Sequence, residues 1–230
     1  MKNLIYLFAI SMIVFATACQ KEEITSEIIP TNPYANVGER HNEILGNFNE
    51  NSAEQMTSTM SSMAKENFII QTIFEEENID PAIFAEAKER LELSPNDLIT
   101  DYDFTNYDQF FRTIGLEDDT RNLLSTFLGE YVDIVSPIGL DEVEKGIKDL
   151  EIKMMTDHQN SPDFEIAMTY LATLKSTNNY WNANQEEKLP GAKWWQVLLA
   201  DAAGAAIGGL GGGAFAAPVA AVCSAAVSKT

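Results

Sequence analysis

The sequence contains few of the residues that carry catalytic or metal chemistry. Among its 230 residues there are two cysteines, Cys19 and Cys223, and two histidines, His41 and His158. A zinc site or a nucleophile–base pair would need more of them, and no H-E-x-x-H, G-x-S-x-G, P-loop or paired C-x-x-C pattern occurs. We therefore predict a protein that is not an enzyme and that holds no cofactor or metal ion. Cys223, among small apolar residues, is predicted to be a packing residue.

Basic residues are also scarce. Lysine and arginine number 15 against 35 aspartate and glutamate, which gives a formal net charge of −20. Nucleic acids bind surfaces rich in lysine and arginine, so this charge argues against a nucleic-acid partner. It also argues against electrostatic docking of the folded body on anionic lipid. A strongly acidic chain suits a soluble domain whose copies repel one another.

A third absence is the alternation of apolar and polar residues that marks β-strands. Apolar residues recur instead at helical spacing, between prolines and polar caps, and hydrophobic residues make up 45% of the chain, which is enough for a core. The fold class is therefore predicted to be all-α. We expect an irregular helical bundle of about six or seven helices over residues 32–188.

Two local predictions concern the first helices. His41 lies on the apolar stripe of the first helix, so we expect a half-buried structural histidine with a satisfied hydrogen bond. A second helix is predicted to begin at Asn51 or Ser52, because Ser52 and Gln55 have the spacing of a capping box.

The N-terminus has the layout of a secretory signal peptide. Lys2 precedes an apolar run over residues 4–15, and small residues lead from there to Cys19. Cleavage after Ala18 by ordinary signal peptidase would leave Cys19 as a free N-terminal residue.

The residues before Cys19 (F-A-T-A-C) also resemble a bacterial lipobox, in which the cysteine thiol is linked to diacylglycerol. The run C-Q-K-E-E that starts at Cys19 resembles the surface-export signal of Bacteroidota lipoproteins. Residues 32–42 (N-P-Y-A-N-V-G-E-R-H-N) resemble an opening that recurs in uncharacterised lipoproteins of that group. The resemblance implies lipidation of Cys19 and a place in the outer membrane, facing the cell surface. It implies no activity.

These features divide the chain into four parts. We predict a signal peptide (residues 1–18), a lipid-anchored tether (19–31), a helical domain (32–188) and a Gly/Ala-rich apolar C-terminal segment (189–230).

The C-terminal segment has an unusual composition, with no charged residue between positions 202 and 227. Small residues recur there at every fourth position: Gly204, Gly208, Gly212, Ala216 and Ala220. On one continuous helix they would form a narrow stripe that allows close packing in a membrane, in the fold, or between copies of the chain. Trp194 and Trp195 are candidate residues for a membrane interface. In composition the segment resembles the glycine-zipper regions of bacteriocins and pore-forming peptides.

Three outcomes remain open for this segment. It could insert conditionally into a membrane, pack inside the helical domain, or form a disordered or partner-binding tail. Its strongly apolar residues would contribute only about 3 kcal/mol to insertion, before the glycines and Pro218 oppose it. Spanning would therefore be marginal.

We expect a surface-exposed lipoprotein that acts as a non-enzymatic binding or structural module. Its partners would be the membrane and an unidentified protein. The N-terminal lipid would reach the membrane, and so would the C-terminal segment in the first of the three outcomes. The alternative is a membrane-active effector, bacteriocin-like or pore-forming, that uses the glycine-zipper segment.

Overall fold

A computed structural model describes residues 31–131, 140–183, 194–211 and 213–229. Every regular element in these ranges is a helix, so the predicted all-α class is confirmed. The signal peptide, Cys19 and all but the last residue of the tether lie outside the described residues.

The described ranges hold nine α-helices and three short 3₁₀ turns. Seven α-helices belong to the predicted helical domain: α2 (Ala35–Asn51), α3 (Ser62–Glu76), α4 (Ala82–Arg90), α5 (Tyr107–Thr113), α6 (Asp118–Tyr131), α7 (Leu140–Asp157) and α8 (Phe164–Ala183). The C-terminal segment adds α9 (Trp194–Leu210) and α10 (Ala216–Lys229). The 3₁₀ turns are η1 (Ala53–Gln55), η2 (Ile99–Asp101) and η3 (Gly213–Phe215).

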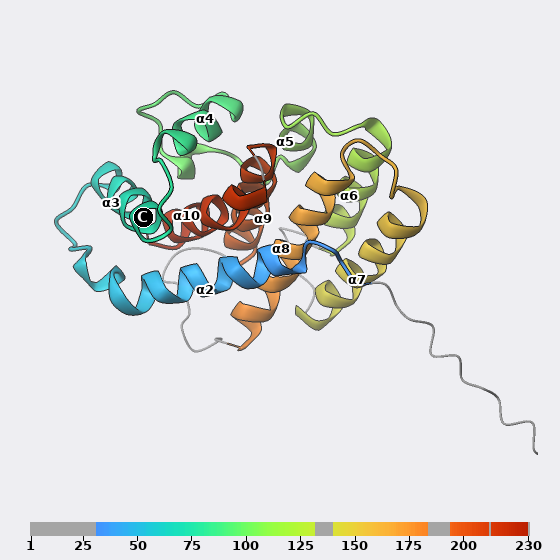
Figure 1. Cartoon of the computed structure of the whole chain (residues 1–230), viewed down its shortest axis with the longest axis horizontal. Coiled ribbons are helices and arrows are strands. Elements are labelled where there is room, and N and C mark those ends of the chain that lie inside the picture. The colour runs from blue at the N-terminus through green and yellow to red at the C-terminus, as the bar shows by residue number, and fades with distance from the viewer. Residues whose placement is uncertain (1–30, 132–139, 184–193, 212, 230) are drawn as a thin grey trace, which may run out of the picture.

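The hairpin of α9 and α10 lies in the middle of the molecule (Figure 1). α10 packs against α9, α2 and α3, while α9 also packs against α8 and, less extensively, against α4. α8 also packs against α2 and α7, and α5, α6 and α7 form one end of the bundle (Figure 1). The helices with the highest mean hydropathy are thus inside, and the amphipathic helix α2 packs against α10 and α8.

The start of the second helix differs from the prediction. α2 continues through Asn51, and Ser52 leads into η1, where the Gln55 N–H donates to the Ser52 backbone carbonyl at 3.0 Å. α3 begins ten residues later than Ser52, at Ser62, and its cap is Ser61, whose hydroxyl accepts from the Ala64 N–H at 3.2 Å. The capping-box prediction was wrong because the serine that follows the turn satisfies the free N–H groups of α3 instead.

The C-terminal segment also differs from the continuous helix that the stripe assumed. It folds as two helices with a break between Leu210 and Ala216, inside the glycine-rich run. Pro218, expected to stop or kink a helix, is the third residue of α10. The first-turn N–H groups of a helix have no intrahelical acceptor, so proline is tolerated there.

Candidate functional site

The small-residue stripe packs against itself across the hairpin. A Cβ added at Gly204 would lie 2.8 Å from the Ala220 Cα, and one added at Gly208 would lie 2.7 Å from the Ala216 Cα and 2.5 Å from the Phe215 carbonyl oxygen. Gly204, Gly208, Ala216 and Ala220 are all buried. These four residues therefore allow the α9 and α10 backbones to pack closely. Of the predicted packing roles for the stripe, this is the one inside the fold.

The other predicted site residues are only partly described. Cys19 and Gly212 lie outside the described residues. Trp194 and Trp195 are the first two residues of α9, and the described part of the structure does not include their side chains.

A buried polar cluster lies beside the hairpin. His41 of α2 and Asp201 of α9 are each 0% exposed, and the His41 Nε2 lies 3.4 Å from the Asp201 Oδ2. The same carboxyl oxygen accepts from the Thr177 Oγ1 of α8 at 2.8 Å. Ser224 of α10 is also fully buried, and its hydroxyl lies near enough to Asp201 to lower the pKa of that carboxyl group. The cluster therefore joins four helices around one carboxyl group.

The neighbouring asparagine indicates which nitrogen of His41 carries the proton. The Asn42 Nδ2 donates to the backbone carbonyl and the hydroxyl of Ser176, at 2.9 and 2.8 Å, which turns the Asn42 Oδ1 toward His41. The His41 Nδ1 lies 2.9 Å from this oxygen and must donate to it. The neutral ring then presents the lone pair of Nε2 to Asp201.

Burial shifts both groups of the pair toward their neutral forms. Desolvation lowers the pKa of His41 from 6.5 to about 4, with a smaller opposing effect from Asn42. Desolvation raises the pKa of Asp201 well above its ordinary value of 3.8, and the hydroxyls of Thr177 and Ser224 oppose the increase. A protonated Asp201 facing a neutral imidazole places no net charge in the core.

Cys223 lies next to this cluster and is 1% exposed. Burial, followed by the carboxyl groups of Asp201 and Glu66, raises the pKa of its thiol well above the ordinary value. A thiolate is the reactive form of cysteine, so this environment suits a packing residue. Among the described residues no group of three or more His, Cys, Asp or Glu side chains is arranged to hold a metal ion.

A second buried polar contact ties α3 to α4 and η2. Glu66 is 0% exposed, forms an ion pair with Lys88, and accepts from the Ile99 N–H at 2.6 Å. The Lys88 Nζ also donates to the Asp97 carbonyl oxygen. Glu66 and Lys88 therefore each bind a backbone group as well as each other, which is a structural role for the two charges.

The sequence predicted a half-buried His41 on an apolar stripe, whereas the structure buries it completely, and the residue that it faces was not predicted. Asp201 is the last acidic residue before the uncharged stretch, and Thr177 precedes it by 24 positions. A signal was available in α8, where Thr169, Thr173 and Thr177 are four residues apart and all buried. Such a hydroxyl stripe on a core helix indicates a polar or small-residue partner. Its partner is the face of α9 that carries Asp201 and, two turns on, Gly209.

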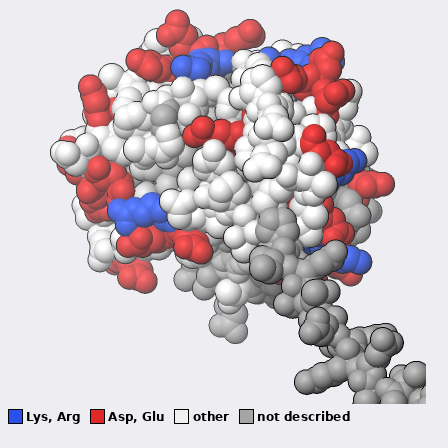
Figure 2. Space-filling model, turned by 45° about the vertical axis from the view of Figure 1, so that its right-hand side comes forward, with Lys and Arg blue, Asp and Glu red and all other residues white. Residues whose placement is uncertain are grey.

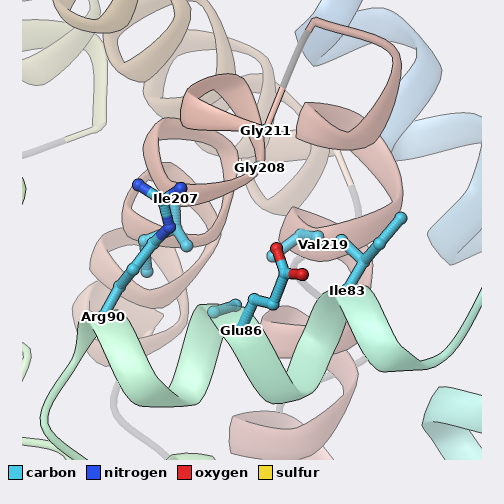
Figure 3. Close-up of a pocket in the computed structure, with 8 residues that line it drawn as sticks. Ile83, Glu86, Arg90, Ile207, Gly208, Gly211 and Val219 are labelled. Atoms are coloured by element: carbon cyan, nitrogen blue, oxygen red, sulfur yellow. The ribbon is translucent and has the colours of Figure 1, made fainter.

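Two surface cavities are lined by described residues. The first, named here the tether groove, has a volume of about 270 Å³ and lies between α2, α7 and α8, with walls formed by Thr31, Asn32, Ala35, Lys148, Glu151, Ile152 and Lys175. The second is a slot of about 10 Å³ between α4 and the hairpin, where Arg90 extends toward Ile207 and Glu86 toward Val219 (Figure 3). The slot holds no more than one water molecule. The tether groove has room for a small organic group.

Neither of these two cavities is lined by His41 or Asp201, and the tether groove, the larger of the two, is the candidate binding site. A scan against protein-family models, a search of curated proteins and a search of solved structures each found no match to this chain.

Proposed function

We propose that the chain is a surface-exposed lipoprotein of the outer membrane, anchored through Cys19, whose helical body is a non-enzymatic binding or structural module. The acidic surface supports this proposal. Figure 2 shows acidic side chains distributed over much of one face, with fewer basic ones among them. Such a surface keeps copies of a soluble body apart and keeps the body off anionic lipid.

The observation that carries the proposal is the burial of the C-terminal hairpin. From Val197 to Ile207, and from Ala216 to Ala226, every residue is buried, and α2, α3 and α8 surround the two helices. A tail in this position is the core of the body. It leaves the N-terminal lipid as the proposed contact with the membrane.

The hairpin geometry also bears on the alternative, a membrane-active effector. α9 has 17 residues and α10 has 14. At 1.5 Å per residue they are roughly 25 and 21 Å long, whereas the hydrocarbon core of a bilayer is about 30 Å thick. No helix in the described part of the chain is both long and apolar enough to cross a membrane. The binding or structural module is therefore the function that we favour.

Limited proteolysis and truncation test the role of the hairpin. We expect the segment around residues 184–230 to be as protected as the body, and deletion of residues 191–230 to unfold the body, since α2, α3 and α8 lose their packing partner. A soluble, cooperatively folded truncated body would contradict the module. Dye release from liposomes by the intact protein, abolished by Gly208→Leu, would support the effector instead.

Detergent partitioning tests the anchor. The protein produced in its host should enter the detergent phase of a Triton X-114 extract, and Cys19→Ser should move it to the aqueous phase, since the acyl chains are then lost. Cys223→Ser is the matched control, because it removes the other thiol and should leave partitioning unchanged. Equal partitioning of Cys19→Ser and the unmodified chain would refute the lipid anchor.

A further inference from the structure

The tether groove lies where the described chain begins. Thr31, the first described residue, is in its wall, and residues 19–30 precede it in the chain. Twelve residues span at most about 40 Å when fully extended. An anchor at Cys19 would therefore limit the distance between the groove and the membrane to about that length.

The groove brings positive charge together on a strongly acidic protein. Its floor is organised by Glu151, whose side chain is 4% exposed and whose two oxygens accept from the Asn32 Nδ2 and the Lys175 Nζ, each at 2.8 Å. The Asn32 Nδ2 is shared with the Met168 carbonyl oxygen at 2.9 Å. Glu151 thus fixes the Lys175 ammonium in the wall, and that ammonium keeps two further N–H groups for a ligand.

Two more features add to this charge. Lys148 is exposed at the groove, and no hydrogen bond or ion pair joins it to another described residue. The first residue of α2, Ala35, also lines the groove, and the first turn of α2 has neither an acidic residue nor a side-chain cap. The Ala35 and Val37 N–H groups donate to the Asn32 and Tyr34 carbonyl oxygens, so the contribution of α2 is the positive end of the dipole of a 17-residue helix, beside the two lysines.

The charges of Lys148, Lys175 and Glu151 leave one net positive charge, which matches a singly charged oxyanion. Ala35 and Ile152 add an apolar wall beside it. Lysine binds oxygen anions as a point charge, whereas arginine favours anions that can accept two parallel hydrogen bonds in one plane. A phosphodiester has one negative charge and an attached organic group, and phospholipid headgroups contain one.

We propose that the tether groove binds the phosphodiester of a phospholipid headgroup, with Lys148 and Lys175 as its ligands and Glu151 as a positioning residue. The inference rests on the lipid anchor of the proposed function for its source of ligand, although the chemistry of the groove does not depend on the anchor. A bound headgroup would hold the body against the membrane in one orientation. An acidic body would otherwise be repelled from that surface.

The test uses residues 20–230, which include every described residue and lack Cys19, so that binding is measured without the lipid. Glycerophosphoethanolamine is titrated while the ε-methylene NMR signals of the lysines are followed. We expect saturable shifts of the Lys148 and Lys175 signals. Lys148→Gln and Lys175→Gln should each bind the compound at least about tenfold more weakly than the unmodified chain, which is the effect of losing one charge-assisted hydrogen bond. Lys145→Gln is the matched control, an exposed lysine of α7 outside the groove, and should bind as the unmodified chain does.

Three comparisons decide the outcome. Acetate that binds as well as the phosphodiester, or equal loss in Lys145→Gln and Lys148→Gln, would overturn the proposal. If the phosphodiester bound only to a chain shortened to start at Thr31, the tether would be the natural occupant of the groove, and the proposal would also be overturned. Sedimentation with phosphatidylethanolamine–phosphatidylcholine vesicles separates the sources, because binding of the soluble compound alone would exclude a lipid ligand.

The anchor and the groove fail in different experiments. Loss of the Cys19 effect on detergent partitioning refutes the anchor, whereas an unresponsive Lys148 refutes the groove.

Discussion

The His41–Asp201 pair determines how the stability of the fold changes with pH. The pKa of His41 falls from 6.5 to about 4 in the folded protein. Its contribution to stability is therefore complete above pH 6.5 and is lost as the pH falls through about 4, at about 1.4 kcal/mol per pH unit and about 3 kcal/mol in all. The pKa of Asp201 is raised above 3.8. Its contribution is complete below pH 3.8 and is lost, at the same rate, as the pH rises toward its folded pKa.

The two effects oppose each other above pH 3.8, because the unfolded chain holds its proton on the histidine while burial favours a proton on Asp201 in the folded chain. Above pH 6.5 the unfolded histidine releases its proton, and the two states then differ by one proton for as long as the folded carboxyl group stays protonated. Stability should therefore fall by about 1.4 kcal/mol per pH unit until the folded carboxyl group ionises.

Asp201→Asn isolates this effect, because the amide oxygen still accepts from Thr177 and the side chain no longer titrates. Urea unfolding is followed by circular dichroism between about pH 5 and pH 8 for the variant and the unmodified protein. The difference in unfolding free energy, variant minus unmodified, should increase with pH, by about 1.4 kcal/mol per unit while the folded carboxyl group stays protonated, and should become constant once that group ionises. The many surface carboxylates are common to both proteins and cancel in the difference.

His41→Gln should have the opposite effect, since it removes the contribution that is lost below pH 6.5. His158→Gln makes the same change at the other histidine and leaves the pair intact, so it controls for the loss of an imidazole. A difference between Asp201→Asn and the unmodified protein that stays constant from pH 5 to pH 8 would refute the neutral pair. It would mean that Asp201 is already ionised in the fold.

Two further predictions concern packing. Gly208→Ala places a Cβ 2.5 Å from the Phe215 carbonyl oxygen and should destabilise the fold by about 1–3 kcal/mol. Gly46→Ala, with no atom within 4 Å of the new Cβ, should instead stabilise α2 by about 0.5–1 kcal/mol. If the urea midpoints of the two variants changed in the same way, the close hairpin contact would be contradicted. Lys88→Met leaves Glu66 buried without its cation and should cost about 3–5 kcal/mol in the same assay, and a cost below about 1 kcal/mol would show that the pair is solvated.

The helical class and most helix positions could be predicted because they depend on local patterns. Apolar residues at helical spacing, with prolines and polar caps between them, predict helices whatever their neighbours are. The prediction of six or seven helices for residues 32–188 agrees with the seven that the structure describes there. The error at Ser52 arose because Ser52 and Ser61 both have a residue pattern suited to capping, and only the path of the intervening turn decides between them.

The polar cluster could not be predicted, because its members come from four helices. His41 and Asp201 are 160 positions apart, and nothing local to either residue indicates the other. The same holds for the tether groove, where Asn32 meets Glu151 across 119 positions. Side chains that satisfy one another in a core are selected by the packing of helices, which a single sequence does not specify.

The C-terminal segment shows why composition alone does not separate a membrane helix from a core helix. A bilayer and a protein interior both exclude water, so both accept an uncharged stretch rich in alanine and glycine. The spacing holds more information. Positions 204 and 220, and positions 208 and 216, lie at equal distances from position 212, inside a glycine-rich run that weakens a continuous helix. When the chain reverses there, each half of the stripe faces the other half, as Gly204 faces Ala220. A straight helix would need a second copy of the chain to cover the same stripe, so a small-residue repeat that is symmetric about a glycine-rich break predicts an intramolecular hairpin.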